Sequence, residues 1–580
     1  MGRNITYHHT LSVSYTLPIN KIPLTNWITS TAKYGANYDW IAAPPAITQL
    51  GNAIQNSNTK QINGMFSFDK LYKKVKYLNN VDQKFSGKRK PAANAIKKGL
   101  EAKESIETAA DTSATKKPKK DPGPSIFDYI FRVFMGLRSV TISYSETNGI
   151  YLPGYGPKSQ IIGQDWNANA PGLPFLFGDQ ADIRPLAIDH EWITKDTTLN
   201  SLYHTTFTQN LNVKATLEPI PNFKIDLTAD RNYSLNHQEY FRADASGNYQ
   251  SFSPTESGNF TISFLPINSA FSPYEKDGNQ IFQNFKAYTK DIANRLAASN
   301  PNYDGSLDSA NYPTGYGLSS QEVLIPAFIA AYSNQNPSSS KFSLSPFPKI
   351  PMPNWSFTYD GLSKIEFLKK YFSKVSLNHG YKSTYSVSSF TSDLNYDGVN
   401  GYSSTYNTTG NFISQYLIYD VQLTEQFSPL LGINVTMNNS MTAKVEYRKE
   451  RTLGMSLSSY QINERNYNEI VVGLGYKIKD VVIPYKLQGV KKKLKSDLDL
   501  KSTISVKDEK VVLRKYIEDI NEEYSGGKVF TINISADYMV SKKLSVRLFF
   551  DRTATNPFVP SSFRTVTASS GLTFRFTLSQ

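Results

Sequence analysis

The 580-residue sequence contains no cysteine. Disulfides, thiolate catalysis and cysteine-ligated zinc are therefore excluded, while the cell compartment is left open. Tryptophan is also scarce, with 5 residues against 37 tyrosines and 33 phenylalanines. The mean hydropathy of −0.42 is low. A membrane β-barrel is compatible with this value, because only every second residue of a spanning strand faces lipid.

Long apolar runs are missing as well. The longest, residues 323–332, covers about ten positions and contains Pro326, whereas a transmembrane helix needs roughly 20 residues. Residues 1–9 lack the apolar core of a signal peptide. A barrel of the outer membrane must first be exported, so if the chain forms one, we expect it to be the C-terminal part of a longer chain, or its start to have been misplaced.

The positive charge is concentrated in one segment. The net charge of the chain is +14. Residues 70–120 contribute most of it, because they contain 15 Lys or Arg and 5 Asp or Glu. Such a basic run is typical of a solvated loop, and the alternative is an anchor for anionic lipid or for a partner. Nucleic acid is not an expected partner, because the run lacks a recognition fold and interleaved aromatic residues.

The C-terminal residues alternate with the period of a β-strand. One face carries the apolar residues Leu572, Phe574, Phe576 and Leu578, and the other face carries Thr573, Arg575 and Thr577. A short turn at 541–543 precedes a similar strand, whose apolar face holds Leu544, Val546 and Leu548. An Arg or Lys at mid-membrane costs about 2–4 kcal/mol. We therefore expect the apolar residues to face lipid and the Thr and Arg residues to face a wet lumen.

The same alternation recurs in pairs of segments joined by turn residues. Residues 211–217 and 223–230 flank a turn with Pro219 and Pro221, and residues 433–437 and 441–447 flank a three-residue polar turn. These patterns predict β-hairpins. Many half-polar hairpins, with tight turns on one side and longer loops on the other, predict an all-β, antiparallel transmembrane barrel.

Two segments interrupt the strands. We divide the chain into barrel strands at 1–69, a Lys-rich insertion, partly helical or disordered, at 70–125, strands and loops at 126–280, a helical and Pro-rich insertion at 281–353, and C-terminal strands at 354–580. Apolar residues at helical spacing predict an amphipathic helix over about 281–298 with a packing role; they are Phe282, Phe285, Tyr288, Ile292 and Leu296.

No motif for catalysis or cofactor binding is complete. Residues 393–398 match the opening of a calcium loop, but Ser404 stands where the closing Glu is required, so a polar surface turn is the favoured interpretation. We expect no catalytic, cofactor-binding or metal-binding residues, no cofactor and no enzymatic activity.

Several unusual strings resemble the C-terminal region of the SprA (Sov) family, the outer-membrane translocon of the type IX secretion system. They are residues 38–44 (YDWIAAP), 83–89 (QKFSGKR), 321–328 (QEVLIPAF), 346–351 (PFPKIP), 379–385 (HGYKSTY), 425–430 (EQFSPL), 536–541 (ADYMVS), 548–551 (LFFD) and 556–558 (NPF). The resemblance implies one very large barrel in the cell outer membrane that exports folded cargo and is linked to gliding motility. It also implies a PorV-like shuttle protein, a periplasmic plug protein and secreted cargo proteins as partners, besides outer-membrane lipid.

Two other functions stay open on the sequence. A plugged outer-membrane nutrient transporter would have the same strand pattern, although a compact plug and an energy-coupling segment are not visible. A soluble β-rich surface adhesin would also alternate, with one wet face on each strand.

Overall fold

The computed structural model describes residues 4–86, 125–272, 279–398, 401–487, 490–541, 543–560 and 562–577. Its main element is one antiparallel sheet of 17 strands, which confirms the predicted all-β class. The strands are β1 (Thr6–Leu17), β2 (Ile28–Ile41), β3 (Asn52–Ser67), β4 (Leu137–Tyr155), β5 (Tyr203–Ile220), β6 (Phe223–Ala243), β7 (Tyr249–Ser263), β8 (Asn354–Tyr359), β9 (Phe372–Ser392), β10 (Tyr416–Ile418), β11 (Asp420–Met437), β12 (Met441–Ser456), β13 (Gln461–Leu487), β14 (Val490–Lys515), β15 (Ile520–Met539), β16 (Leu544–Pro557) and β17 (Thr565–Phe576).

Within the described residues, the helices lie in the connections between strands. The α-helices are α1 (Phe68–Lys74), α2 (Lys76–Ser86), α4 (Ile126–Phe134), α5 (Leu173–Leu176), α6 (Arg184–Asp189), α7 (Gln280–Ser299), α8 (Gln321–Ser333) and α9 (Glu366–Lys369), and the short 3-10 turns are η1 (Pro18–Lys21), η2 (Pro45–Leu50), η3 (Ile161–Gly163), η4 (Ile267–Ser269) and η5 (Gly361–Lys364). Within the described residues, no helix combines the length and the apolar character needed to cross a bilayer.

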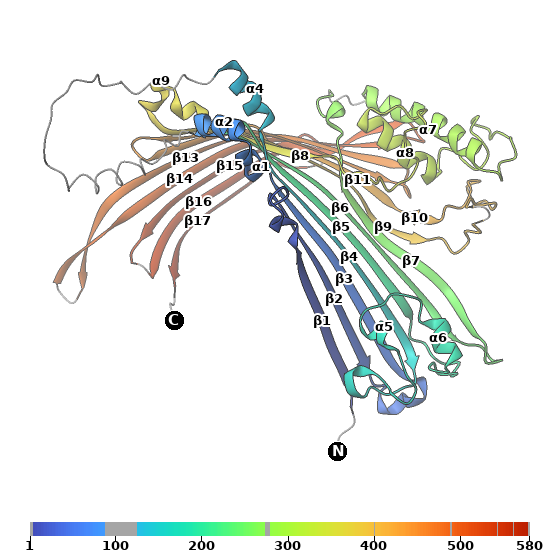
Figure 1. Cartoon of the computed structure of the whole chain (residues 1–580). Helices are drawn as coiled ribbons and strands as arrows, with labels where there is room; N and C mark the ends of the chain where they lie inside the picture. The colour runs from blue at the N-terminus through green and yellow to red at the C-terminus, as the bar shows by residue number, and fades with distance from the viewer. Residues whose placement is uncertain are drawn as a thin grey trace, which may run out of the picture.

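The sheet is a meander in which most strands pair with their neighbours in sequence. The pairing runs from β1 to β7, continues through β9 and β11, and then follows chain order to β17, while β8 pairs with β6 and β9. The sheet bends into an arch, with β1–β7 and β13–β17 forming its two arms (Figure 1). Among the described registers, none joins the outer edge of β1 to that of β17.

The two ends of the sheet differ in their connections. At one end, which we call the turn end, β5 joins β6 through Pro221 and Asn222, and β11 joins β12 through residues 438–440. Both predicted hairpins are thus confirmed. The opposite, loop end carries the long connections 156–202 and 393–415. The connection between β3 and β4, which holds α1, α2 and α4, belongs to the turn end, and its Lys-rich residues 87–124 lie outside the described ranges.

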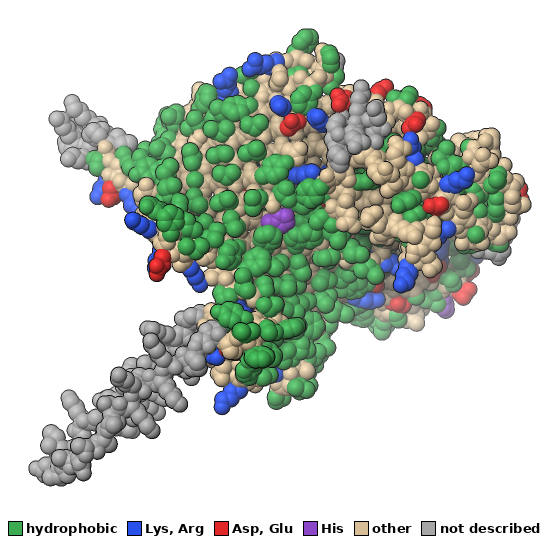
Figure 2. All heavy atoms as spheres, turned by 90° about the horizontal axis from the view of Figure 1, so that it is seen from above, with side chains coloured by type: hydrophobic (Ala, Val, Ile, Leu, Met, Phe, Trp, Pro, Cys, Tyr) green, Lys and Arg blue, Asp and Glu red, His purple; other side chains and the backbone are tan. Residues whose placement is uncertain are grey.

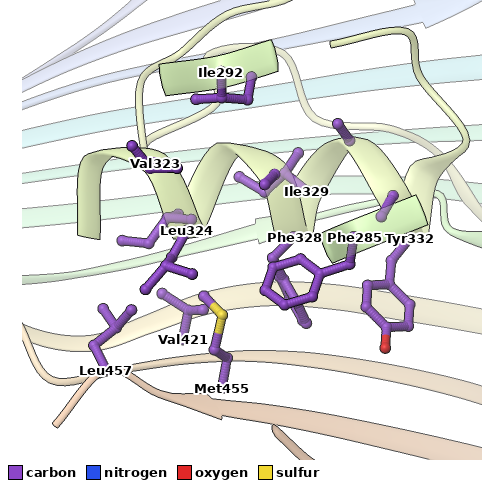
Figure 3. Packing of buried hydrophobic residues seen from close by; sticks show 14 of the residues in the cluster. Phe285, Ile292, Val323, Leu324, Phe328, Ile329, Tyr332, Val421, Met455 and Leu457 are labelled. Atoms are coloured by element: carbon purple, nitrogen blue, oxygen red, sulfur yellow. The ribbon is translucent and has the colours of Figure 1, made fainter. Parts of the chain in front are cut away.

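The predicted amphipathic helix is α7, and it packs on α8 over the convex side of the sheet (Figures 1 and 3). Its predicted apolar residues Phe282, Phe285 and Ile292 are buried. The longest apolar run forms α8, which is buried from Val323 to Ser333. An α-helix that is apolar all round belongs in a core. Below α8 lie Val421, Met455 and Leu457 from the sheet side (Figure 3).

Candidate functional site

One face of the sheet carries an apolar band at the turn end. In β13 the band consists of Ile470, Val472, Leu474 and Tyr476, whose side chains are 37–52% exposed. Directly opposite residues in an antiparallel pair share a face. Val472 lies opposite Val445 on β12 and Ile504 on β14. The band therefore continues from strand to strand.

We call this band the apolar belt and define it by its limiting rows. The row nearer the loop end is Leu431, Tyr447, Ile470, Val506, Phe530, Ala554 and Val566, and the row nearer the turn end is Ile478, Leu498, Tyr538, Val546 and Phe574. On β13 the belt spans nine residues, from Ile470 to Ile478, which is about 26 Å of strand. A tilted membrane-spanning strand uses about 9–11 residues.

A polar row closes the belt toward the loop end. On the same face, the next row is Lys449, Asn468, Asp508, Lys528 and Asn556. Charged and amide side chains thus replace apolar ones across five strands at one level. Seen from above, hydrophobic side chains cover a broad area of the sheet surface next to the helical insertion (Figure 2).

The opposite, concave face is polar at the level of the belt. Glu446 forms ion pairs with Lys444 at 3.2 Å and with Arg448 at 2.6 Å, and Arg448 also contacts Glu469 at 3.3 Å. Further along, Glu509 pairs with both Lys507 and Arg465. Acidic and basic groups alternate on this face, so it suits water and does not suit lipid.

The structure groups the C-terminal apolar residues singled out by the alternation. Leu544 lies opposite Phe576, Val546 opposite Phe574, and Leu548 opposite Leu572. Leu572, Phe574, Phe576 and Leu548 are each more than half exposed on the convex face. Leu578 lies outside the described residues.

The polar residues of the last strand occupy the other face. Thr573 lies opposite Arg547, and Arg575 lies opposite Ser545. Thr577 follows the strand, and its N–H donates to the carbonyl of Lys543 at 2.8 Å. That these three residues line a lumen stays a prediction.

At the loop end the same convex face is covered by the chain itself. The insertion between β7 and β8 buries Phe260, Tyr385, Leu423 and Leu453 of the sheet. Around α5 and α6, a second cluster covers Tyr38, Ile54 and Leu152 with other residues of β2–β4. The apolar face is therefore covered by protein toward the loop end and exposed over most of the belt, where Tyr538 is a buried exception.

A buried ion pair, which sequence reasoning missed, attaches the insertion to the sheet. Arg451 on β12 contacts Glu425 on β11 at 2.9 Å. Its guanidinium also donates to the carbonyl and to Oγ of Ser269 in η4, each at 2.7 Å. Tyr381 donates to the second oxygen of Glu425 at 2.7 Å. A signal did exist in the sequence, since Glu425 and Arg451 interrupt apolar alternations.

A second buried pair lies under α7. Arg514 on β14 contacts Glu464 on β13 at 2.9 Å, and both side chains are almost fully buried. The guanidinium lies 5.4 Å from the centre of the Phe282 ring of α7, a favourable cation–π distance. Removing one partner of such a pair leaves an uncompensated buried charge.

The calcium-like segment forms a polar turn. The backbone N–H and Oγ of Ser404 both donate to Asp397, and these hydrogen bonds lower the pKa of the Asp397 carboxyl. Across the described ranges, no group of three His, Cys, Asp or Glu could hold a metal ion.

No family model matches this chain, and no curated protein does. Similar solved structures include the RagAB peptide importer in the "open-open" state, at 7% identity and a TM-score of 0.26, covering 94% of this chain and 50% of that one. The FrpB iron transporter from Neisseria meningitidis follows at 7% identity and 0.24, with coverages of 96% and 62%. The siderophore receptor PirA from Acinetobacter baumannii has 9% identity and 0.17, with coverages of 98% and 70%. This chain thus spans about half the length of the RagAB chain.

Proposed function

We propose that this chain is a wall segment of a very large outer-membrane β-barrel, the protein-conducting translocon of the type IX secretion system. One observation carries the membrane part of the proposal. The convex face has an apolar belt whose height matches the length of a membrane-spanning strand, and the concave face behind it is charged. A barrel wall between lipid and a wet lumen requires this arrangement.

The exposed area weighs against a soluble adhesin. The belt presents Ile, Val, Leu and aromatic side chains on adjoining strands from β11 to β17. Soluble proteins rarely expose contiguous apolar patches beyond a few hundred Å². At the loop end, by contrast, the insertion between β7 and β8 and the segment around α5 and α6 cover the apolar residues of this face.

The curvature supports a wide barrel. Sixteen to 18 strands suffice to close a porin, yet β1 and β17 of this 17-stranded arch are not paired with each other in the described registers. Open sheet edges do not occur in lipid. Further strands on both outer edges are therefore part of the proposal.

The identity of the barrel rests on the ordered sequence strings that resemble the SprA family. A PorV-like shuttle, a periplasmic plug and secreted cargo are the partners that come with it. Transport is passive within the wall: the polar lumen replaces lipid, and partners decide when the channel is open. The helices α7 and α8 pack on the convex side of the arch.

Planar-bilayer recordings on the full-length barrel, stripped of plug and shuttle, test the proposal. We expect large, long-lived pores and, in cells lacking the gene, loss of cargo secretion with nutrient uptake intact. Small, solute-sized conductance, or a growth defect limited to one nutrient with secretion intact, contradicts the translocon and favours the transporter.

A further inference from the structure

The helix α4 is inverted relative to an ordinary surface helix. Of its nine residues, seven expose large apolar side chains: Ile126, Phe127, Tyr129, Ile130, Phe131, Val133 and Phe134. Its two charged residues, Asp128 and Arg132, are the buried ones, at 2% and 3% exposure. A helix that rests on a protein in water normally buries its apolar stripe.

The buried charges set this orientation. Asp128 accepts hydrogen bonds from Lys84 at 2.9 Å and Tyr77 at 3.2 Å, both from α2, and it closes a capping box with Ser125. Arg132 donates to Asp82 of α2 at 3.0 Å and lies 3.5 Å from Glu218 of β5. These polar contacts hold the apolar side of α4 outward.

The helix lies at the turn end of the sheet, beside β4 and β5. Only Met135 and Gly136 separate α4 from β4, and the Gly136 carbonyl accepts from the N–H of Glu218 at 2.6 Å. At this end Val140 lies opposite Ala215, and Ile142 opposite Val213. Ile142 is itself an exposed apolar residue of the sheet. An apolar helix surface therefore adjoins the end of an apolar sheet surface.

Exposed lysines accompany this apolar surface. The neighbouring helices α1 and α2 expose Lys70, Lys73, Lys74 and Lys76. An apolar helix face next to basic residues is the combination that binds the boundary between anionic headgroups and acyl chains.

We propose that α4 lies in this boundary on the turn-end side of the membrane, with its apolar residues among acyl chains and the lysines of α1 and α2 at anionic headgroups. The occupant of this surface is lipid, because the surface adjoins exposed apolar residues of the sheet such as Ile142 and carries cationic neighbours. This inference rests on the proposed membrane function and adds a lateral anchor that sets the depth of the barrel wall.

Site-directed spin labelling of the full-length barrel tests the proposal, and the absence of cysteine from these 580 residues means that a cysteine introduced here is the single labelling site among them. Ile130→Cys reports on α4, Leu474→Cys on the belt, and Thr141→Cys on the concave face. Each protein is reconstituted in phosphatidylcholine vesicles with and without phosphatidylglycerol. Accessibility is measured to oxygen, which concentrates in lipid, and to a water-soluble nickel chelate.

We expect the Ile130→Cys label to be reached by oxygen several-fold better than by the chelate, as for Leu474→Cys, and Thr141→Cys to show the opposite ratio. Phosphatidylglycerol should deepen the α4 label, and Lys73→Gln with Lys74→Gln should remove that effect. A label on α4 that favours the chelate, or is shielded from both quenchers, while Leu474→Cys stays in lipid, overturns the anchor alone. Failure at Leu474→Cys overturns the proposed membrane function as well. If the depth of the α4 label is the same with and without phosphatidylglycerol, the proposed contact with anionic headgroups is overturned.

Discussion

Arg451 and Glu425 form an ion pair 2.9 Å apart on neighbouring strands, buried under the insertion that carries α7 and α8. The pair occupies the same face as the apolar belt, beyond its polar boundary row. Because Arg451 also holds Ser269 of the insertion, one side chain links two strands to their cover.

Replacing Arg451 alone should be strongly destabilising. Arg451→Met leaves Glu425 buried and uncompensated, and we expect a loss of about 3–5 kcal/mol in the free energy of unfolding. Urea unfolding of the micelle-bound protein measures this loss. Arg448→Met is the matched control, since Arg448 is partly exposed on the concave face and such pairs contribute about 0–1 kcal/mol. Equal losses in the two variants would show that burial of the Arg451 pair does not govern its contribution.

The α8 core predicts a contrast between two phenylalanines. Phe328 of α8 is buried in the core at 1% exposure, whereas Phe574 on β17 is 64% exposed. Phe328→Ala should cost about 3–5 kcal/mol of stability, because it leaves a cavity. Phe574→Ala should cost far less in detergent. The same unfolding titration compares them, and a large loss at Phe574 would mean that protein covers it.

Two neighbouring residues of β14 lie on opposite faces of the sheet. Ile504 belongs to the belt, and Thr503 points to the concave face opposite Gly473. Ile504→Arg should cost about 2–4 kcal/mol of membrane stability, while Thr503→Arg should be nearly neutral because it faces water. Folding titrations in lipid vesicles measure both variants. Equal effects would remove the distinction between a lipid face and a lumen face.

The attachment of α4 should depend on pH only in strong acid. Hydrogen bonding from Lys84, then from Ser125, lowers the pKa of Asp128 from 3.8 to about 2. A depressed folded-state pKa contributes stability that is fully present above the unfolded value and is lost as pH falls through the folded value. We therefore expect an Ile130→Cys label on α4 to stay immobile above pH 4 and to gain mobility between about pH 4 and pH 2.

Asp128→Asn is the control for this titration. It removes the titrating group, so the label should be more mobile at every pH and its mobility should not change over that interval. An unchanged transition in this variant would assign the acid response to another carboxyl.

Strands were predictable because their information is local. Alternation over residues 211–217 and 223–230, with two intervening prolines, was enough to place β5 and β6. The structure extends β5 at both ends, to Tyr203 and Ile220, and extends β6 away from the turn, to Ala243. The α7 helix followed from its spacing in the same way. Predicted bounds of 281–298 differ from the observed ones by one residue at each end, since capping by Asn279 sets the start.

Long-range relationships were not accessible to the same reasoning. Arg451 and Ser269 lie 182 residues apart, and no periodicity relates them. The sequence of α4 shows an apolar helix with two charges but does not reveal that the charges point inward, because their partners come from α2 and β5.

The sequence by itself determined the alternation of apolar and polar side chains, the hairpin turns and the helical spacing of α7, because period and turn chemistry act over a few residues. Only the tertiary structure decided which parts of the apolar face are covered by the chain and which stay open. That choice depends on where insertions fold back over strands distant in sequence, and on buried charge pairs that form only when those strands meet.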